Sequence, residues 1–302
     1  MTEGDSPTIA RRRVRLAIRE AREAAALTQQ QVAEEMEWSL SKVIRIENGD
    51  VSIAPNDLRP LLAYLGIKDR DRVTAMLTDA KVARTRQRRA WWQHPDFRDQ
   101  LTDALRRFIE YEAEAVAIRS YSIYYMPGLV QTPEYAAALT GTFHEEIPQE
   151  RIRVLLEARK LRRESLLSRL GSVQYFMVLD ESVFMRPTGG EEVFAAQLRD
   201  MHRLAEQGLL HIRMLPFALG SPIANNASYD LLSLGDDNAG NEVLYRENGL
   251  TDELVEEKAS TSRHRNRFEK LWHLAASEAD TIAFIAARIS NLEKTIADRQ
   301  GK

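Results

Sequence analysis

Short polar and cationic side chains lie close together between residues 40 and 48, and their types suit hydrogen bonding to DNA. If a helix begins after Ser39, then Ser41 and Arg45 project from one exposed face, one helical turn apart. An arginine guanidinium can pair with both major-groove acceptors of guanine, and a serine hydroxyl can bond to any base edge. We therefore expect Ser41 and Arg45 to contact bases.

Three further polar residues in the same stretch suit contacts with the phosphate backbone. Gln29 stands at the start of an expected helix, where its amide and the free backbone N–H groups can meet one phosphate. Lys42 and Asn48 belong to the next expected helix. We expect Gln29, Lys42 and Asn48 to bind phosphates.

The pattern from residue 27 to residue 49 predicts the two short helices that would position these groups. Thr28 and Ser39 are good N-caps, and Asn48-Gly49 can end the second helix with a left-handed backbone. The expected inward residues of the two helices are Val32, Ala33, Met36, Val43 and Ile46. Such a pair is typical of a helix-turn-helix, although periodicity alone would also allow an ordinary helical hairpin.

The segment from Val14 to Ile67 resembles the XRE family of bacterial and phage repressors, whose domain has five helices. The residues that carry the resemblance are Leu27-Thr28-Gln29, Val32-Ala33, Ser39-x-Ser41-x-Val43, Arg45-Ile46-Glu47-x-Gly49, Pro55, Leu58, Leu61-Leu62 and Tyr64-Leu65-Gly66. The resemblance implies base contacts at Leu40, Ser41 and Arg45, and a structural ion pair between Arg22 and Glu47. One departure is Glu37, where the family usually has a glycine in the turn.

Composition limits the remaining possibilities. The 302 residues include 44% hydrophobic residues, enough for one large or two moderate cores. The absence of cysteine excludes disulfides, thiol nucleophiles and cysteine-ligated metals, and fits a cytoplasmic, nucleoid-associated protein. No run of eighteen apolar residues and no signal-peptide core is present. With a net charge of −3, any DNA binding must come from a local patch.

No pattern in the chain predicts an enzyme, a metal site or a cofactor. Asp180-Glu181 follows an expected strand, but this acidic pair is more typical of a helix cap and first turn. Gly189-Gly190 could hold an anion before a helix, but is more typical of a loop. No two of the six histidines have a metal-binding spacing, and no P-loop, nucleophile elbow or dinucleotide fingerprint occurs.

The whole chain is predicted to be an α+β protein of two domains. A disordered tail (1–9) should precede a five-helix repressor-like DNA-binding domain (10–80), which begins with an arginine-rich helix from about Thr8 to Ala25 whose charges could reach phosphates. A basic linker (81–92) should lead to an α+β sensing or dimerisation domain (93–302). This second domain should contain a long helix from about His94 to Ala117, a small mainly antiparallel sheet, and helices throughout residues 252–298.

The second region also resembles a known group, the antitoxin-like XRE regulators whose C-terminal domain has no known function. The residues that carry the resemblance are Trp91-Trp92, the run from Tyr121 to Ala136 around Pro127-Gly128-Leu129-Val130-Gln131-Thr132, Val178-Leu179-Asp180-Glu181, Arg186-Pro187-x-Gly189-Gly190 and Met214-Leu215-Pro216-Phe217. The resemblance implies transcription control and a small companion protein. Three functions therefore remain open: a regulator that binds operator DNA, an antitoxin-like component of a two-protein system, and an enzyme fused to a DNA-binding domain.

Three hypotheses concern how the second domain acts. Tyr121, Tyr124, Tyr125 and Tyr135 could line a ligand pocket, or could simply form one face of a sheet. The apolar faces of the helices in residues 252–298 could hold a homodimer. Trp91-Trp92 could dock the basic linker onto the second domain, so that a ligand or partner near the tyrosines alters DNA binding.

Overall fold

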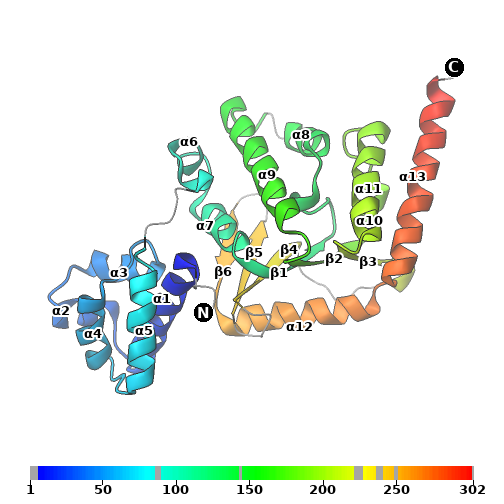
Figure 1. Ribbon diagram of the computed structural model, residues 1–302. Coiled ribbons are helices and arrows are strands. Elements are labelled where there is room, and N and C mark those ends of the chain that lie inside the picture. The colour runs from blue at the N-terminus through cyan, green and yellow to red at the C-terminus, as the bar shows by residue number, and fades with distance from the viewer. Residues whose placement is uncertain are drawn as a thin grey trace. The chain divides into compact units, whose positions relative to one another are not determined.

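In the computed structural model, five helices form the first part of the chain (Figure 1). The structure describes residues 6–85, 90–142, 145–220, 227–235, 241–247 and 251–300. The chain divides into two units, which we call unit 1 (Met1–Ala90) and unit 2 (Trp91–Lys302). The helices of unit 1 are α1 (Pro7–Ala24), α2 (Gln29–Glu35), α3 (Leu40–Asn48), α4 (Pro55–Tyr64) and α5 (Arg70–Val82).

The core of unit 1 consists of the apolar residues that the helical periodicity places inward. Val32 of α2 and Val43 and Ile46 of α3 are buried, together with Val14 and Ile18 of α1. α4 begins at a proline rather than after a capping side chain. Its N-cap is Ala54, which makes no side-chain hydrogen bond, and Pro55 occupies the first helical position, where its missing N–H costs little.

The first helix begins within the segment that was predicted to be a disordered tail. Ser6 Oγ accepts a hydrogen bond from the Thr8 backbone N–H at 3.3 Å, and Pro7 starts the helix. Thr8 and Ala10 are buried, so residues 7–9 belong to the folded unit. Residues 1–5 of the predicted tail, and residues 86–89 of the predicted basic linker, lie outside the described residues.

A six-stranded mixed sheet forms the centre of unit 2. The strands are β1 (Ala115–Ser122), β2 (Gln174–Asp180), β3 (His211–Leu215), β4 (Tyr229–Leu234), β5 (Glu242–Glu247) and β6 (Asp252–Val255), in the order β3-β2-β1-β4-β5-β6. β1 is parallel to β2, and β2 to β3. The other three pairings are antiparallel, with Ser120 opposite Asp230 and Asp230 opposite Tyr245.

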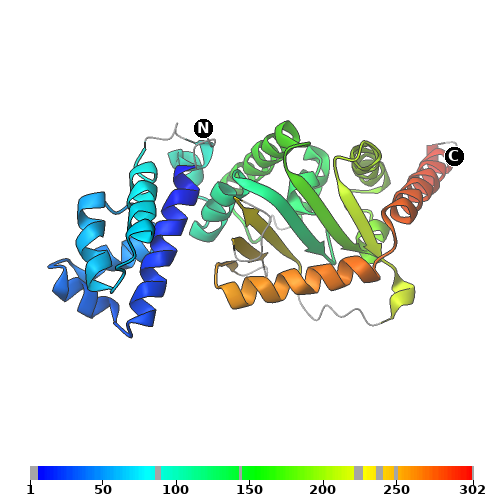
Figure 2. The same ribbon diagram turned by 60° about the horizontal axis from the view of Figure 1, so that its bottom comes forward.

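Helices cover both faces of this sheet. α12 (Lys258–Leu274) crosses one face, and α7 (Asp103–Glu112), α8 (Pro133–Gly141), α9 (Gln149–Arg169) and α11 (Glu191–Glu206) lie on the other (Figures 1 and 2). α13 (Glu278–Gln300) packs against α11 and the edge strand β3. The short helices are α6 (Pro95–Arg98), α10 (Glu181–Met185) and the 3₁₀ turns η1 (Trp91–Gln93), η2 (Gly128–Val130) and η3 (Phe217–Leu219). The α+β fold class is thus confirmed.

Two predictions about elements of unit 2 are wrong. The single helix expected from His94 to Ala117 is divided into α6 and α7, because Thr102 caps a new helix by accepting from the Leu105 N–H at 3.1 Å. The helical prediction for residues 252–298 missed β6, which pairs with β5 before α12 begins. None of the described helices is long and apolar enough to span a membrane.

Candidate nucleic-acid interface

The outer face of α3 presents the three residues that were predicted to contact bases. Leu40 is 39% exposed, and Ser41 and Arg45 are also exposed. Within the described part of the chain, neither the Ser41 hydroxyl nor the Arg45 guanidinium forms a hydrogen bond or ion pair. Both donors therefore face solvent from one side of a short helix, as direct base recognition requires.

The three residues predicted to bind phosphates have different surroundings. Lys42 Nζ lies 3.1 Å from Asp57 Oδ2 and 3.8 Å from the centre of the Trp38 ring. Because this ion pair is well exposed, it is worth little and can be exchanged for a phosphate. Asn48 is half-buried at the last position of α3. The side chain of Gln29 points inward to Glu47, so any phosphate contact there would fall to its backbone N–H or require its amide to rotate.

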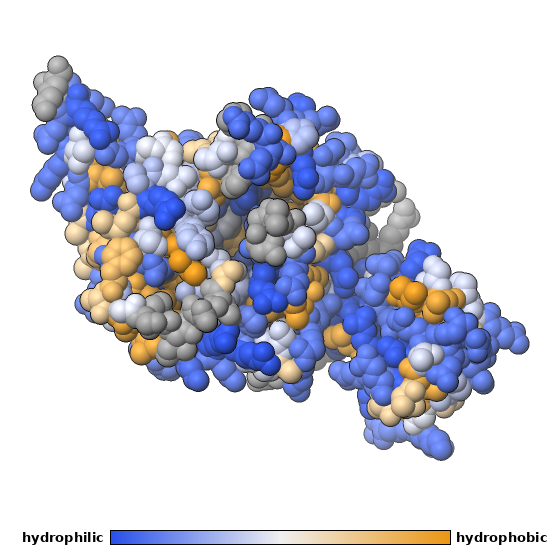
Figure 3. Space-filling view, turned by 180° about the vertical axis from the view of Figure 1, so that it is seen from behind, coloured by the Kyte–Doolittle hydropathy of each residue, from blue (hydrophilic) through white to orange (hydrophobic). Residues whose placement is uncertain are grey.

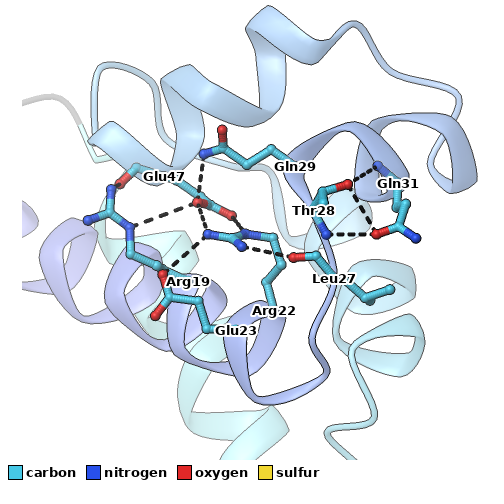
Figure 4. Close-up of polar contacts among 8 residues, drawn as sticks. All are labelled: Arg19, Arg22, Glu23, Leu27, Thr28, Gln29, Gln31 and Glu47. Carbon is cyan, nitrogen blue, oxygen red and sulfur yellow. Dashed lines mark hydrogen bonds and ion pairs between the residues drawn. The ribbon is translucent and has the colours of Figure 1, made fainter.

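A buried carboxylate, Glu47, holds α1, α2 and α3 together behind this face (Figure 4). Only 1% of its side chain is exposed. Arg22 Nε and Nη2 donate to its two oxygens at 2.7 and 3.0 Å, and Gln29 Nε2 donates at 2.9 Å. Arg19 donates to the Glu47 carbonyl at 3.1 Å. The expected Arg22–Glu47 pair is therefore formed, and its hydrogen bonds raise the pKa of Arg22.

Sequence reasoning missed the part that Gln29 and Arg19 play in this network. The signal that could have found it is spacing, since Arg19 and Arg22 share one face of α1. The result is a rigid support, because a buried carboxylate with several charged and neutral donors fixes the helices that carry them.

The caps that were predicted at the ends of α2 and α3 are present. Thr28 Oγ1 accepts from the Gln31 N–H at 3.2 Å, and Gln31 Oε1 accepts from the Thr28 N–H at 2.8 Å, which completes a capping box (Figure 4). Ser39 Oγ accepts from the Lys42 N–H at 3.2 Å. Gly49 ends α3 with φ +83°, and a Cβ there would lie 2.8 Å from Arg15 Cδ, so only glycine fits.

The turn between α2 and α3 carries Glu37 in the left-handed region, with φ +54°. A side chain in this region is strained by roughly 1–2 kcal/mol, and glycine relieves the strain but makes the unfolded chain more flexible. We expect Glu37→Gly to stabilise unit 1 by about 0.5–1 kcal/mol, measured by urea denaturation followed by circular dichroism.

Two variants control for this prediction. Ala26→Gly relieves the same φ, +54°, in the loop before α2 and should also stabilise. Glu34→Gly, inside α2, should destabilise by about 1 kcal/mol. If Glu37→Gly lowered stability as Glu34→Gly does, the turn would not be strained in solution.

The arginines at the start of α1 contribute mainly to structure, in contrast to the phosphate role that their number suggested. Arg12 and Arg15 are buried. Arg13 Nη2 is paired with Asp79 Oδ1 of α5 at 2.6 Å, and Arg11 Nε donates to Ser52 Oγ at 3.2 Å. Because their partners lie on later elements, these side chains hold α1 against the rest of unit 1. Helical periodicity within α1 cannot reveal such distant partners.

In unit 2, the four tyrosines do not line one pocket. Tyr121 packs with Tyr229 on the face of the sheet that α12 covers. Tyr135, on α8, is buried beside Phe194 of α11, on the other face. Tyr124 is 54% exposed, with its ring centre 6.5 Å from that of Tyr125. Tyr121 and Tyr135 therefore lie in different layers, on opposite faces of the sheet, so the four side chains do not form the wall of one shared pocket.

The other candidate groups of unit 2 have structural partners. Asp180 caps α10 by accepting from the Ser182 N–H at 3.0 Å, and Glu181 accepts from the Phe217 N–H at 2.7 Å. Gly189 lies against α8, where a Cβ would be 2.8 Å from Ala138 Cβ. Among the described residues, no group of three histidine, aspartate or glutamate side chains could hold a metal ion.

Comparison with known families agrees with this division of the chain. Residues 105–287, more than half of the chain, match a family described as a domain of unknown function, DUF5753. The chain belongs to the DUF5753 family. Residues 14–76 match a helix-turn-helix domain. This match makes α2 and α3 the two helices of a DNA-binding motif that precedes the DUF5753 region in the sequence. No curated protein and no solved structure matches the chain.

Proposed function

We propose that this protein is a sequence-specific transcriptional regulator of the XRE type, in which α3 enters the major groove of operator DNA. The single observation that carries the proposal is the exposed face of α3, where Ser41 and Arg45 stand without protein partners among the described residues. The buried Glu47 network supports it, because base recognition needs a helix held in one orientation. We propose no catalytic role, since Asp180 and Glu181 are used as caps and backbone acceptors.

Genome-wide mapping of the DNA bound by the protein in its own cells tests this function. We expect discrete peaks that share a short motif and lie upstream of genes. Uniform, weak association with all DNA, or no association, would contradict the proposal.

We further propose that the protein binds DNA as a homodimer through unit 2, because one helix-turn-helix contacts too few bases for useful specificity. The apolar residues of the last helices give less support than the sequence suggested. Phe268, Leu271, Ile285, Ile289 and Leu292 are buried inside unit 2. Apolar surface remains elsewhere: Figure 3 shows hydrophobic residues gathered below the free end of α13, and Met185, Phe217 and Leu274 are exposed.

Light scattering on the full chain at tens of micromolar measures the oligomeric state. We expect twice the mass of one chain. Phe217→Ser changes a side chain of unit 2 that is 57% exposed, and its mass tests whether this apolar surface holds the two chains together. Leu40→Ser, at an exposed side chain of unit 1, is its control. A monomeric wild type would contradict the homodimer.

We propose that Trp91 and Trp92 transmit signals between the units. Both are half-buried and pack with Leu101, Ile109 and Ala158, and the ring centres of Trp91 and Phe97 lie 4.8 Å apart. A ligand or companion protein bound to unit 2 can alter DNA binding only if it favours one arrangement of this segment.

Replacing both tryptophans with alanine tests this role. Because both are only half-buried, we expect unit 2 to stay folded, measured by far-ultraviolet circular dichroism. We expect operator affinity to fall by roughly tenfold, measured by fluorescence anisotropy. Unfolding of unit 2 would show that the tryptophans are core residues. Unchanged affinity would show that the segment takes no part in DNA binding.

A further inference from the structure

A groove of about 370 Å³ lies on unit 1, between α4 and the turn that joins α2 to α3. Its walls include the rings of Trp38 and Tyr64 and the carboxylates of Glu35, Glu37 and Asp57. Both rings are half-buried and pack against the core of unit 1, so the aromatic wall is held in place. The groove has the size of a small binding site, with apolar walls and a few polar groups.

An ammonium group of the protein itself lies against one wall of this groove. Lys42 Nζ is 3.8 Å from the centre of the Trp38 ring and 3.1 Å from Asp57 Oδ2. An ammonium over an indole, with a carboxylate beside it, is a favourable arrangement for a cation. Because the side chains of Lys42 and Asp57 are 39% and 43% exposed, their pair is exchanged at little cost. The wall therefore suits a cation, and Lys42 can leave it.

Two other carboxylates of the groove have no cation beside them. Glu35 and Glu37 are exposed, and neither forms a hydrogen bond or ion pair with any described residue. Lys42 is paired with Asp57 and so balances one carboxylate of the three. The groove therefore has an excess of negative charge, which attracts a cationic group and repels the phosphates of a nucleic acid.

The backbone at Glu37 supports a binding role for this carboxylate. Its φ of +54° lies in the left-handed region, which glycine adopts without strain. A glutamate at this position therefore costs stability that a glycine would not. Strained residues of this kind are concentrated at binding sites, and Glu37 lies on the groove wall beside Trp38.

We propose that this groove binds an arginine side chain of a partner protein. A guanidinium is planar, so it can replace Lys42 over the Trp38 ring while its N–H groups donate to the carboxylates that line the groove. Because the groove is open to solvent, a side chain that projects from another protein can enter it. The inference goes beyond the reading of DNA, and the contact that it describes forms without DNA.

Fluorine NMR on the full chain labelled with fluorotryptophan, without DNA and at low ionic strength, tests the proposal. The chain has four tryptophans, and Trp38→Phe identifies the signal of Trp38. The probe is a blocked peptide with one arginine between glycines, and its control carries citrulline, which has nearly the same shape without the charge. We expect the arginine peptide to shift the Trp38 signal saturably and the citrulline peptide to leave it unchanged.

Matched variants separate a contact in the groove from a general effect of charge. Glu35→Gln and Glu37→Gln together should weaken binding of the arginine peptide about tenfold, because each exposed charge pair contributes a few-fold. Lys42→Met should strengthen it a few-fold, because the change frees the Trp38 ring. Glu34→Gln is the control, since Glu34 is an exposed carboxylate of α2 that does not line the groove, and it should bind the peptide as wild type does.

Several results would overturn the proposal. They are an unmoved Trp38 signal, equal binding of the arginine and citrulline peptides, equal losses in Glu34→Gln and in the double variant, or weaker binding by Lys42→Met. Tighter binding of spermidine than of the arginine peptide would also overturn it, because the occupant would then be a small polyamine rather than a protein.

Discussion

Replacing Glu47 with alanine is expected to lower the free energy of unfolding of unit 1 by about 3–5 kcal/mol. The carboxylate is 1% exposed and receives two hydrogen bonds from Arg22 and one from Gln29. Its removal leaves the Arg22 guanidinium, whose side chain is 13% exposed, without its main acceptor. A buried charge that loses its partner costs far more than a surface pair contributes.

Hydrogen exchange of the full chain, followed by mass spectrometry, measures this loss in the affected helices. Peptides from α1, α2 and α3 should exchange faster in Glu47→Ala, while peptides from β1 and β2 keep their wild-type rates. Glu23→Ala is the matched control, because Glu23 is 60% exposed and meets Arg22 only at 3.4 Å. Equal exchange in Glu47→Ala and Glu23→Ala would show that the network does not hold the helices together.

Replacing Arg45 with alanine is expected to cost about 1–3 kcal/mol of binding energy at the mapped operator. The guanidinium is exposed on α3 and has no partner within the described structure, so its loss should leave the fold of unit 1 intact. The preference for one base should disappear at one base pair of each half-site, because a bidentate contact distinguishes guanine from other bases. Fluorescence anisotropy with the operator and with single-base variants of it measures both effects.

Lys42→Ala provides the contrasting result on the same helix. A phosphate contact carries no sequence information, so this variant should weaken binding to all DNA alike and reduce the salt slope by about one. If Arg45→Ala also lost affinity uniformly, Arg45 would be a backbone contact rather than a base contact.

Local signals were sufficient to predict much of unit 1. The Thr28 and Ser39 caps, the left-handed Gly49 and the inward Val43 and Ile46 all depend on residues within a few positions of one another. The Arg22–Glu47 pair came from the family resemblance and is formed. The inward turn of Gln29 could not be predicted, because Glu47 is its partner from another helix.

Unit 2 was less predictable because its elements end where distant segments meet. Thr102 starts α7 and also donates to Asp252 of β6, 150 residues later. β6 is only four residues long and has two acidic residues, which are common at sheet edges but resemble a helix start when read locally.

Selection of bound sequences from random double-stranded DNA tests most directly whether α3 reads DNA sequence. The account predicts that the purified wild-type chain enriches one motif, and that Arg45→Ala enriches the same motif with one position per half-site no longer specified. Failure of the wild type to enrich any motif, or an identical motif from Arg45→Ala, would contradict the account.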